Sequence, residues 1–310
     1  MKRVFIIGSE GTTGLRLRER LEKRKDLELL SVCEELRKDS NELARIMAQA
    51  DFTFLCLPDT AAREMAALAT STNTRLIDTS TAHRTDNAWV YGFPELNSEQ
   101  KSRIAASNRV TVPGCHASGF IALVAPLMQA GLLPKTTQLA CTSLTGYSGG
   151  GKKMIAQYQA ANRGIEYEST FLYAMSQQHK HLPEMTVHTG LSKPPIFMPV
   201  VGDYYSGMVV SVTLDGDTLT KAASPVSLIE IYKNHYKNSP MLHIVEDSPT
   251  SLYANAFSGR DDMEIFVSGT ASQIQLTARF DNLGKGASGA AIQCFNIMCG
   301  EMEAEGLALS

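Results

Sequence analysis

The sequence has no uninterrupted apolar run approaching the ~18 residues that a membrane-spanning helix requires. It has no cluster of basic residues, and its net charge is −3, so we expect neither a nucleic acid nor a membrane as partner. The N-terminal apolar run, VFII, stops at a glycine and is too short for a signal peptide. We therefore expect a cytoplasmic protein that acts on small molecules.

The chain also lacks C-x-x-C pairs, internal repeats and low-complexity segments. Its six cysteines are widely spaced, which favours free and mostly buried thiols over disulfides or a metal cluster. A length of 310 residues with 44% hydrophobic residues is sufficient for about two domains, each with its own core.

The first hundred residues alternate strand-like and helix-like segments. This order is typical of βαβ units, which form a parallel sheet with ligands beyond the carboxyl ends of its strands. We therefore predict an α/β Rossmann domain at the N-terminus. Its strands are expected at residues 3–7, 27–32, 51–57 and 75–78.

A glycine loop, GSEGTTG, joins the first strand to a helix-like segment. Gly8, Gly11 and Gly14 would let the backbone approach a pyrophosphate, which the helix N-terminus attracts. Thr12 and Thr13 belong to the same predicted cofactor site. The alternative is an ordinary strand–helix turn.

The residue pattern leaves NAD and NADP open. Glu34 follows the last glycine by about 20 residues, the spacing of an acid that binds the ribose hydroxyls of NAD. Arg37 and Lys38 are close to it and could instead accept the 2′-phosphate of NADP.

A lone thiol lies at a strand-to-helix corner in TVPGC, residues 111–115. The helical pattern that follows places Cys115 at or just before a helix N-terminus, with Ser118 as a possible cap. That location lowers the pKa of a thiol, so Cys115 is a candidate nucleophile. The alternative is a buried cysteine with no chemical role.

After about residue 136 the alternation ends. Strands at 138–144, 208–214, 265–268 and 273–280 predict an α+β domain with a mostly antiparallel sheet. We predict a dinucleotide-binding domain at 1–114, completed by a C-terminal helix at 285–310, and a catalytic and oligomerisation domain at 115–284.

A nucleophilic thiol needs a partner for proton transfer, and the segment HKHLPEM offers one. Pro183 suits the first turn of a helix, so His179 and His181 would precede that helix in extended chain, with both side chains on one side. Glu184 could orient one of them. These three residues could instead ligate a metal, but no second ligand cluster is present and we expect no metal.

Several motifs resemble one family, the short form of N-acetyl-gamma-glutamyl-phosphate reductase, related to the aspartate-semialdehyde dehydrogenases. Besides the glycine loop they are DTSTAHR (78–84), YGFPELN (91–97), VPGC (112–115), HKHLPEM (179–185) and DNLGKGASGAAIQ (281–293). YGFPEL and H-x-H-x-P-E are particular to this family. The chain departs from the family after the cysteine, where His116 replaces an aromatic residue and Ala117-Ser118 a Pro-Thr pair.

The resemblance implies NADPH-dependent reduction of N-acetyl-gamma-glutamyl phosphate through a Cys115 thioester, in arginine biosynthesis. It implies that His179 is the general acid/base, with His181 less favoured and Glu184 in support. It also places Asn282 near the nicotinamide, and suggests a homodimer or homotetramer.

The acyl phosphate must also be held by cations or hydrogen-bond donors. We expect Arg84 and Lys152 to bind substrate, and Ser148 and Gly149 to contact the cofactor, although Ser148 could equally hold a phosphate and Arg84 a structural carboxylate. Reduction of N-succinyl-glutamyl or aspartyl phosphate, and a non-catalytic NADP-binding regulator, are the alternative functions.

Overall fold

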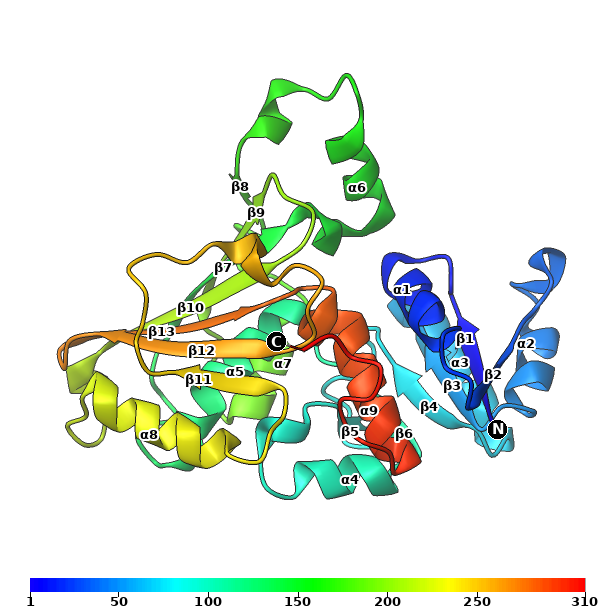
Figure 1. Ribbon diagram of the computed structural model, residues 1–310, viewed down its shortest axis with the longest axis horizontal. Helices are drawn as coiled ribbons and strands as arrows, with labels where there is room; N and C mark the ends of the chain where they lie inside the picture. The colour runs from blue at the N-terminus through cyan, green and yellow to red at the C-terminus, as the bar shows by residue number, and fades with distance from the viewer. Residues whose placement is uncertain (310) are drawn as a thin grey trace. The chain divides into compact units, whose positions relative to one another are not determined.

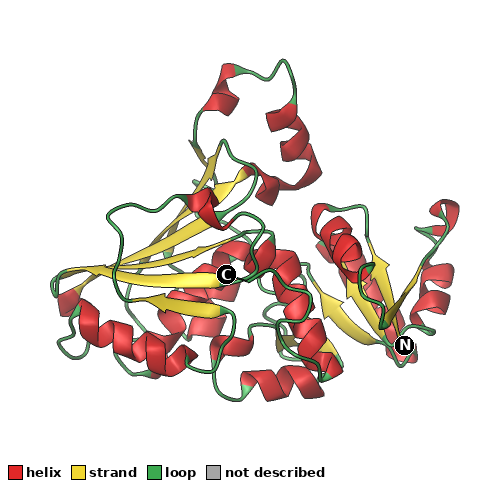
Figure 2. Ribbon diagram, in the orientation of Figure 1, coloured by secondary structure: helices red, strands yellow, loops and turns green. Residues whose placement is uncertain are grey.

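The computed structural model describes residues 1–309, which form two compact units (Figure 2). The first unit comprises Met1–Pro94, Glu99–Pro113 and Ala287–Leu307. The second contains Gly114–Gly286 together with the short segment Glu95–Ser98. Three residues of the YGFPELN motif, Glu95, Leu96 and Asn97, therefore belong to the second unit, whereas the sequence placed all of residues 1–114 in the first.

The first unit contains a six-stranded sheet of order β2-β1-β3-β4-β6-β5, in which every strand pair is parallel. Its strands are β1 (Lys2–Ile7), β2 (Leu27–Leu30), β3 (Phe52–Leu55), β4 (Arg75–Asp78), β5 (Val90–Tyr91) and β6 (Arg109–Thr111). Its helices are α1 (Thr12–Leu21), α2 (Ser40–Met47), α3 (Asp59–Leu68), α4 (Gln100–Ala106) and α9 (Gly289–Cys299).

Helices cover both faces of this sheet because its strands are apolar on both sides. In β1, Val4 packs in a cluster with Leu17 of α1 and Phe295 of α9. The next residue, Phe5, points to the opposite face and packs with residues of α2 and α3. Two apolar faces of this kind are typical of buried parallel strands, and the predicted Rossmann domain is confirmed.

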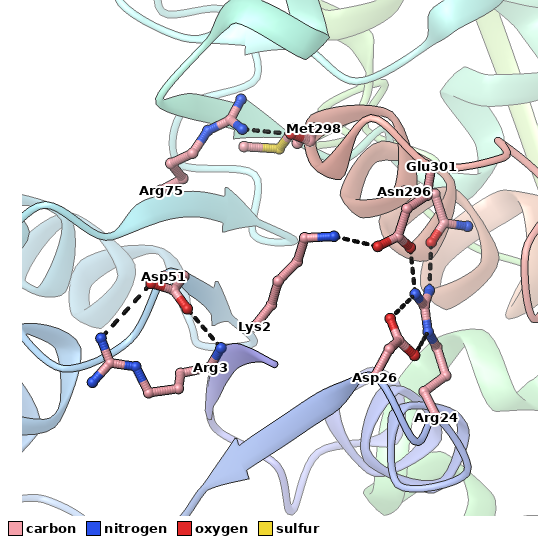
Figure 3. A network of polar contacts seen from close by, with 9 residues as sticks. All are labelled: Lys2, Arg3, Arg24, Asp26, Asp51, Arg75, Asn296, Met298 and Glu301. Carbon is pink, nitrogen blue, oxygen red and sulfur yellow. Dashed lines mark hydrogen bonds and ion pairs between the residues drawn. The ribbon is translucent and has the colours of Figure 1, made fainter.

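The C-terminal helix α9 is joined to the start of the chain by charged and polar contacts as well as by its core (Figure 3). Arg24 donates to Asn296 Oδ1 at 2.7 Å and pairs with Asp26 at 2.6 Å. Glu301, just after α9, forms ion pairs with both Lys2 and Arg24. The helix is shorter than the predicted 285–310, because residues 284–288 form a wider π-helical turn before it and Gly300, in the left-handed conformation, ends it after Cys299.

The second unit contains a seven-stranded sheet of order β11-β12-β13-β10-β7-β9-β8. Only β11–β12 and β7–β9 are parallel, so the predicted mostly antiparallel sheet is confirmed. Its strands are β7 (Ala140–Gly146), β8 (Phe171–Leu172), β9 (Ile196–Gly202), β10 (Met208–Asp215), β11 (Leu242–Val245), β12 (Met263–Gly269) and β13 (Gln273–Phe280). Its helices are α5 (Cys115–Gln129), α6 (Gly151–Gln159), α7 (Leu182–Thr189) and α8 (Pro225–Tyr236).

Helix α5 packs directly on β10 and β13 in this unit (Figure 1). Gly119 makes this close packing possible, since a Cβ there would lie 2.6 Å from Val210 and 2.9 Å from Phe280. Nearly every residue of α5 is buried, which explains its almost uniformly apolar sequence. The first residue of this fixed helix is Cys115.

Candidate active site

Cys115 is the first residue of α5, with Gly114 as N-cap, and its side chain is half-buried. Ser118 is not the cap, because it lies inside the helix and donates back to the Gly114 carbonyl at 3.2 Å. A Cβ at Gly286 would lie only 2.8 Å from Cys115 Cβ, so a glycine is needed for the 281–286 segment to pass beside the thiol. The thiol thus lies at the positive end of a helix whose position is fixed by close packing.

Glu184 supports the helix end that carries the thiol. This buried carboxylate, in the first turn of α7, accepts a hydrogen bond from Gly114 N at 2.7 Å. It thereby satisfies a backbone N–H at the start of α5 that no helical carbonyl can reach. The sequence suggested that Glu184 orients a histidine, and that stays a prediction; this bond shows that Glu184 also supports the Cys115 corner.

His179 and His181 are close together, but not in extended chain as the sequence predicted. Leu182 N donates to the His179 carbonyl at 3.0 Å, which closes a turn, and His181 has a helical backbone conformation at the N-cap of α7. His181 N donates to His179 Nδ1 at 3.1 Å, and the two ring centroids are 4.8 Å apart. The turn brings the rings together through a local hydrogen bond.

A ring nitrogen of His181, a ring nitrogen of His116 and the Cys115 sulfur all lie within 4.8 Å of one another. The structure therefore brings the buried His181 to the thiol. The half-buried His179 contacts the rings of His181 and His116.

His116 is a buried residue that sequence reasoning noted only as a departure from the family. Its Nδ1 and Nε2 lie 2.7 Å from Ser143 Oγ and from Tyr173 Oη, respectively. Burial, assisted by the nearby charges of His179 and Lys180, lowers the pKa of His116 to about 3. The imidazole beside Cys115 is therefore neutral at physiological pH.

Asn282 organises the loop after β7. Its Oδ1 accepts from Gly207 N at 2.9 Å, and its Nδ2 donates to Ser148 Oγ at 3.0 Å. A Cβ at Gly149 would meet only ordinary contacts, at 3.6 Å or more, so the backbone there is open to a ligand. Lys152, near the start of α6, is exposed.

In the first unit, the three loop glycines have different physical roles. Gly8 has a φ of +85°, and a Cβ on Gly14 would lie 2.3 Å from the Gly8 carbonyl, so both are required by the turn itself. A Cβ on Gly11 would have only one neighbour, at 3.5 Å. Gly11 is therefore the position where the backbone is open to a ligand.

The residues beside Gly11 fit a phosphate-bearing cofactor. Gly11 is the N-cap of α1 and gives no side-chain cap to the first helical N–H groups. Thr12 Oγ1 is buried and has no hydrogen-bond partner within residues 1–309. An unpartnered hydroxyl at a helix N-terminus is well suited to bind a pyrophosphate oxygen. Thr13 is the next residue of the same helical turn.

Glu34 and Arg37 lie together in the short turn that follows β2. Arg37 Nη1 is 3.5 Å from Glu34 Oε1, and both side chains are well exposed. The turn thus presents an acid and a base next to each other.

Arg84 is buried and donates to the carbonyls of Val112, at 2.9 Å, and Thr79, at 3.0 Å. These bonds join β4 to the segment after β6. Arg84 therefore has a structural function within the first unit, whatever it contributes to substrate binding.

Two of the family-like motifs meet in the second unit. Lys285 of DNLGKG is fully buried, and its Nζ lies 2.8 and 2.9 Å from the two carboxylate oxygens of Glu95, in YGFPEL. Both motifs carry the family resemblance, but the sequence did not predict that Glu95 and Lys285 form a pair. The sequence signal for this pair is weak, because its acid and its base are 190 residues apart in the chain.

No helix within residues 1–309 is both long and apolar enough to cross a membrane. Residues 3–104 match the family model for the NAD-binding domain of semialdehyde dehydrogenases, and residues 115–282 match the model for their dimerisation domain. The second match alone covers more than half of the chain.

The chain belongs to the semialdehyde dehydrogenase family. It is 40% identical to an N-acetyl-gamma-glutamyl-phosphate reductase 2 from Nostoc sp., over 98% of this chain and 99% of the relative. It is 42% identical to the N-acetyl-gamma-glutamyl-phosphate reductase of Brucella suis, over 96% and 99%. These relatives confirm the predicted resemblance and enzyme class, an NADP-dependent oxidoreductase.

Solved structures of semialdehyde dehydrogenases have the same fold. Aspartate semialdehyde dehydrogenase II from Vibrio cholerae aligns with a TM-score of 0.72 at 16% identity, covering 96% of this chain and 98% of that one. A probable aspartate-semialdehyde dehydrogenase from Pseudomonas aeruginosa aligns with a TM-score of 0.73 at 17% identity, with the same coverage. The dimerisation-domain match supports oligomerisation in this family member.

Proposed function

We propose that this chain uses NADPH to reduce N-acetyl-gamma-glutamyl phosphate to N-acetyl-glutamate 5-semialdehyde and phosphate, a step of arginine biosynthesis. The full-length identity of 40–42% to reductases of that name supports the substrate. The observation that carries the chemistry is Cys115 at the start of α5 with His181 beside it. A cytoplasmic homodimer or homotetramer is part of the proposal.

Cys115 is the proposed nucleophile. Its thiol proton passes to His181, and the sulfur attacks the acyl carbon of the substrate. The carbon–oxygen bond to phosphate breaks, phosphate leaves, and a thioester remains on Cys115. The positive end of α5 favours the thiolate, and the bond from Gly114 N to Glu184 helps to hold that end in place.

His179 has a tautomer suited to the second half of the reaction. Because its Nδ1 accepts the His181 N–H, the proton of the neutral ring is on Nε2. That Nε2–H can donate to the thioester oxygen as negative charge develops on it. We therefore assign His181 to the thiol and His179 to the oxygen, so both residues of the H-x-H pair have a role.

When bound, NADPH supplies the hydride that reduces the thioester carbon. Thr12, Thr13 and the open backbone at Gly11 would hold its pyrophosphate, and Arg37 its 2′-phosphate. In the second unit, Gly149 also has open backbone, on a loop fixed by the Ser148–Asn282 bond, and it stays a predicted cofactor contact. Collapse of the tetrahedral oxyanion then breaks the carbon–sulfur bond, releasing the aldehyde and the thiolate of Cys115.

The substrate carries a carboxylate and a phosphate, which require cations. Lys152 is exposed and its amine is accessible for this purpose. Arg84 already donates to two backbone carbonyls, so we assign it mainly to holding the segment that precedes Cys115.

The reverse reaction tests the substrate. Purified protein is mixed with NADP, phosphate and either N-acetyl- or N-succinyl-glutamate semialdehyde, or aspartate semialdehyde, and NADPH is followed by absorbance. We expect the N-acetyl compound to give the highest kcat/KM, with no NADPH formed without phosphate. Higher kcat/KM for aspartate semialdehyde would contradict the proposed substrate, and no activity with any aldehyde would favour a non-catalytic role.

A further inference from the structure

A thiol and two imidazoles converge at the start of α5. Cys115 is half-buried, His116 and His181 are buried, and one ligand atom from each lies within 4.8 Å of the other two. Sulfur and imidazole nitrogen are the ligand types that Zn²⁺ prefers. The metal ligands that the sequence suggested were His179, His181 and Glu184. The present set shares only His181 with them.

His116 also has the surroundings of a metal ligand. Ser143 Oγ is fully buried and lies 2.7 Å from His116 Nδ1. If Nδ1–H donates to Ser143, the lone pair of the ring is on Nε2. In most metal-binding histidines, the ring nitrogen that does not bind the metal makes such a hydrogen bond, and this bond fixes the orientation of the ring. Nε2 now faces the Tyr173 hydroxyl, which would give up this bond to a metal ion.

The three ligand atoms lie slightly farther apart than they would in a site that holds Zn²⁺. With Zn–S near 2.3 Å and Zn–N near 2.05 Å, tetrahedral ligands are about 3.4–3.6 Å apart. A contraction of roughly 1 Å is within reach of side-chain rotation, since Cys115 is only half-buried. Three protein ligands leave the fourth position for water.

We propose that Cys115, His116 and His181 form a Zn²⁺ site that, when filled, blocks the reductase. On binding, the Cys115 thiol releases its proton to solvent and its sulfur bonds to the metal. The ion then occupies the sulfur that must attack the acyl phosphate. The blocking effect rests on the proposed function, whereas the binding does not. His116 is what adds this property, because the proposed reaction uses only Cys115, His179 and His181.

Co²⁺ is the probe, because its bond to a thiolate gives a near-ultraviolet charge-transfer band. The reduced, metal-free full chain is titrated with Co²⁺, and Zn²⁺ is then added as competitor. We expect one band that Zn²⁺ removes, and that is absent in Cys115→Ser. His116→Phe should weaken Co²⁺ affinity at least tenfold, as should His116→Gln, which keeps a polar side chain if phenylalanine disturbs folding. Cys33→Ser, at an exposed cysteine outside the cluster, should bind as the wild type does.

The outcomes separate this inference from the proposed function. No band, a band that persists in Cys115→Ser, or unchanged affinity in both His116 variants would overturn the site. Activity that continues when the band shows the site filled would overturn the block. A normal band in a protein with no reductase activity would leave the metal site in place and remove the proposed function instead.

Discussion

At the scale of single residues, the proposed chemistry depends on three side chains with different tasks. Cys115 supplies the sulfur, His181 lies within reach of it, and His179 has its proton on Nε2 because of the local turn. These tasks are separable by experiment, because alkylation of the thiol reports on the nucleophile alone and turnover reports on the whole cycle.

Cys115→Ser should remove nearly all reductase activity and leave NADPH affinity unchanged, because a serine hydroxyl is far less ionised than a thiol.

His181→Asn should slow alkylation of Cys115 by iodoacetamide near pH 7. His179→Asn should leave that alkylation rate nearly unchanged but lower kcat by roughly 10²–10⁴. Mass spectrometry of labelled peptides and steady-state kinetics measure these effects. The opposite pattern for the two histidines would exchange their roles.

Gly11→Val should abolish NADPH binding while the protein remains folded. The added Cβ has only one protein neighbour, at 3.5 Å, and the backbone at Gly11 has a φ of −69° and a ψ of 164°, which valine adopts readily. The branched side chain would instead occupy the space of the pyrophosphate. Fluorescence titration with NADPH, alongside a thermal melt, checks this. Unchanged affinity would exclude the glycine loop as the cofactor site.

At the scale of elements, α9 is joined to the first strand by charge as well as by packing. Burial raises the pKa of the Glu301 carboxyl, but hydrogen bonds from Lys2 and Arg24 outweigh burial and hold that pKa below its ordinary value. A carboxyl whose pKa is lowered by folding stabilises the folded protein at pH values above its pKa in the unfolded chain, which is about 4.3. This contribution is lost as the pH falls through the lower pKa of the folded protein.

Glu301→Gln should therefore lower the stability of the first unit at pH 7 by about 1.5–3 kcal/mol, the scale for a hydrogen bond to a charged group. The difference from wild type should shrink as pH falls below about 4. Trp89, the one tryptophan, is buried in the first unit, so its fluorescence in urea reports this unfolding. Glu28→Gln, at an exposed position of β2, is the control. A difference that does not change with pH would exclude the ionic explanation.

At the scale of the whole molecule, the second unit has an exposed apolar sheet face. Ser143 contacts His116 of α5, so the alternate residues of β7 and their partners in β9 face away from α5. On that side Leu144 is 38% exposed, Met198 40% and Ile196 50%. An apolar strip of this kind on a dimerisation domain indicates where a second copy would bind.

Met198→Lys should weaken self-association at least tenfold, because it introduces a charge at the centre of this strip. Sedimentation velocity at several protein concentrations measures the effect. Met175→Lys, in the loop after β8 and 78% exposed, is the matched control. Equal association constants for the two variants would exclude the β7–β9 face as the interface.

The sequence by itself determined the periodic elements. Strands β4 and β13 have the predicted bounds, and β10 and β12 lie within a few residues of theirs, because short apolar or alternating runs bounded by polar residues and turns mark strands in the sequence itself. The sequence also placed Cys115 at or just before a helix N-terminus, since Pro-Gly ends the strand before it, although it suggested Ser118 rather than Gly114 as the cap. It did not predict β9, because Pro199 argues against a strand. Proline has no N–H to donate to a neighbouring strand. In β9 this is tolerated because the edge strand β8 pairs only with Val200 and Val201.

Only the tertiary structure decided what surrounds the thiol. The Glu184 bond to Gly114 N joins residues that are 70 apart in the chain, and in the same unit the buried Glu95–Lys285 pair joins residues that are 190 apart. His116 became a neutral imidazole beside Cys115 because the fold buries it between Ser143 and Tyr173. Local patterns encode where helices and strands form, whereas the protonation and partners of a buried side chain depend on segments far away in the chain.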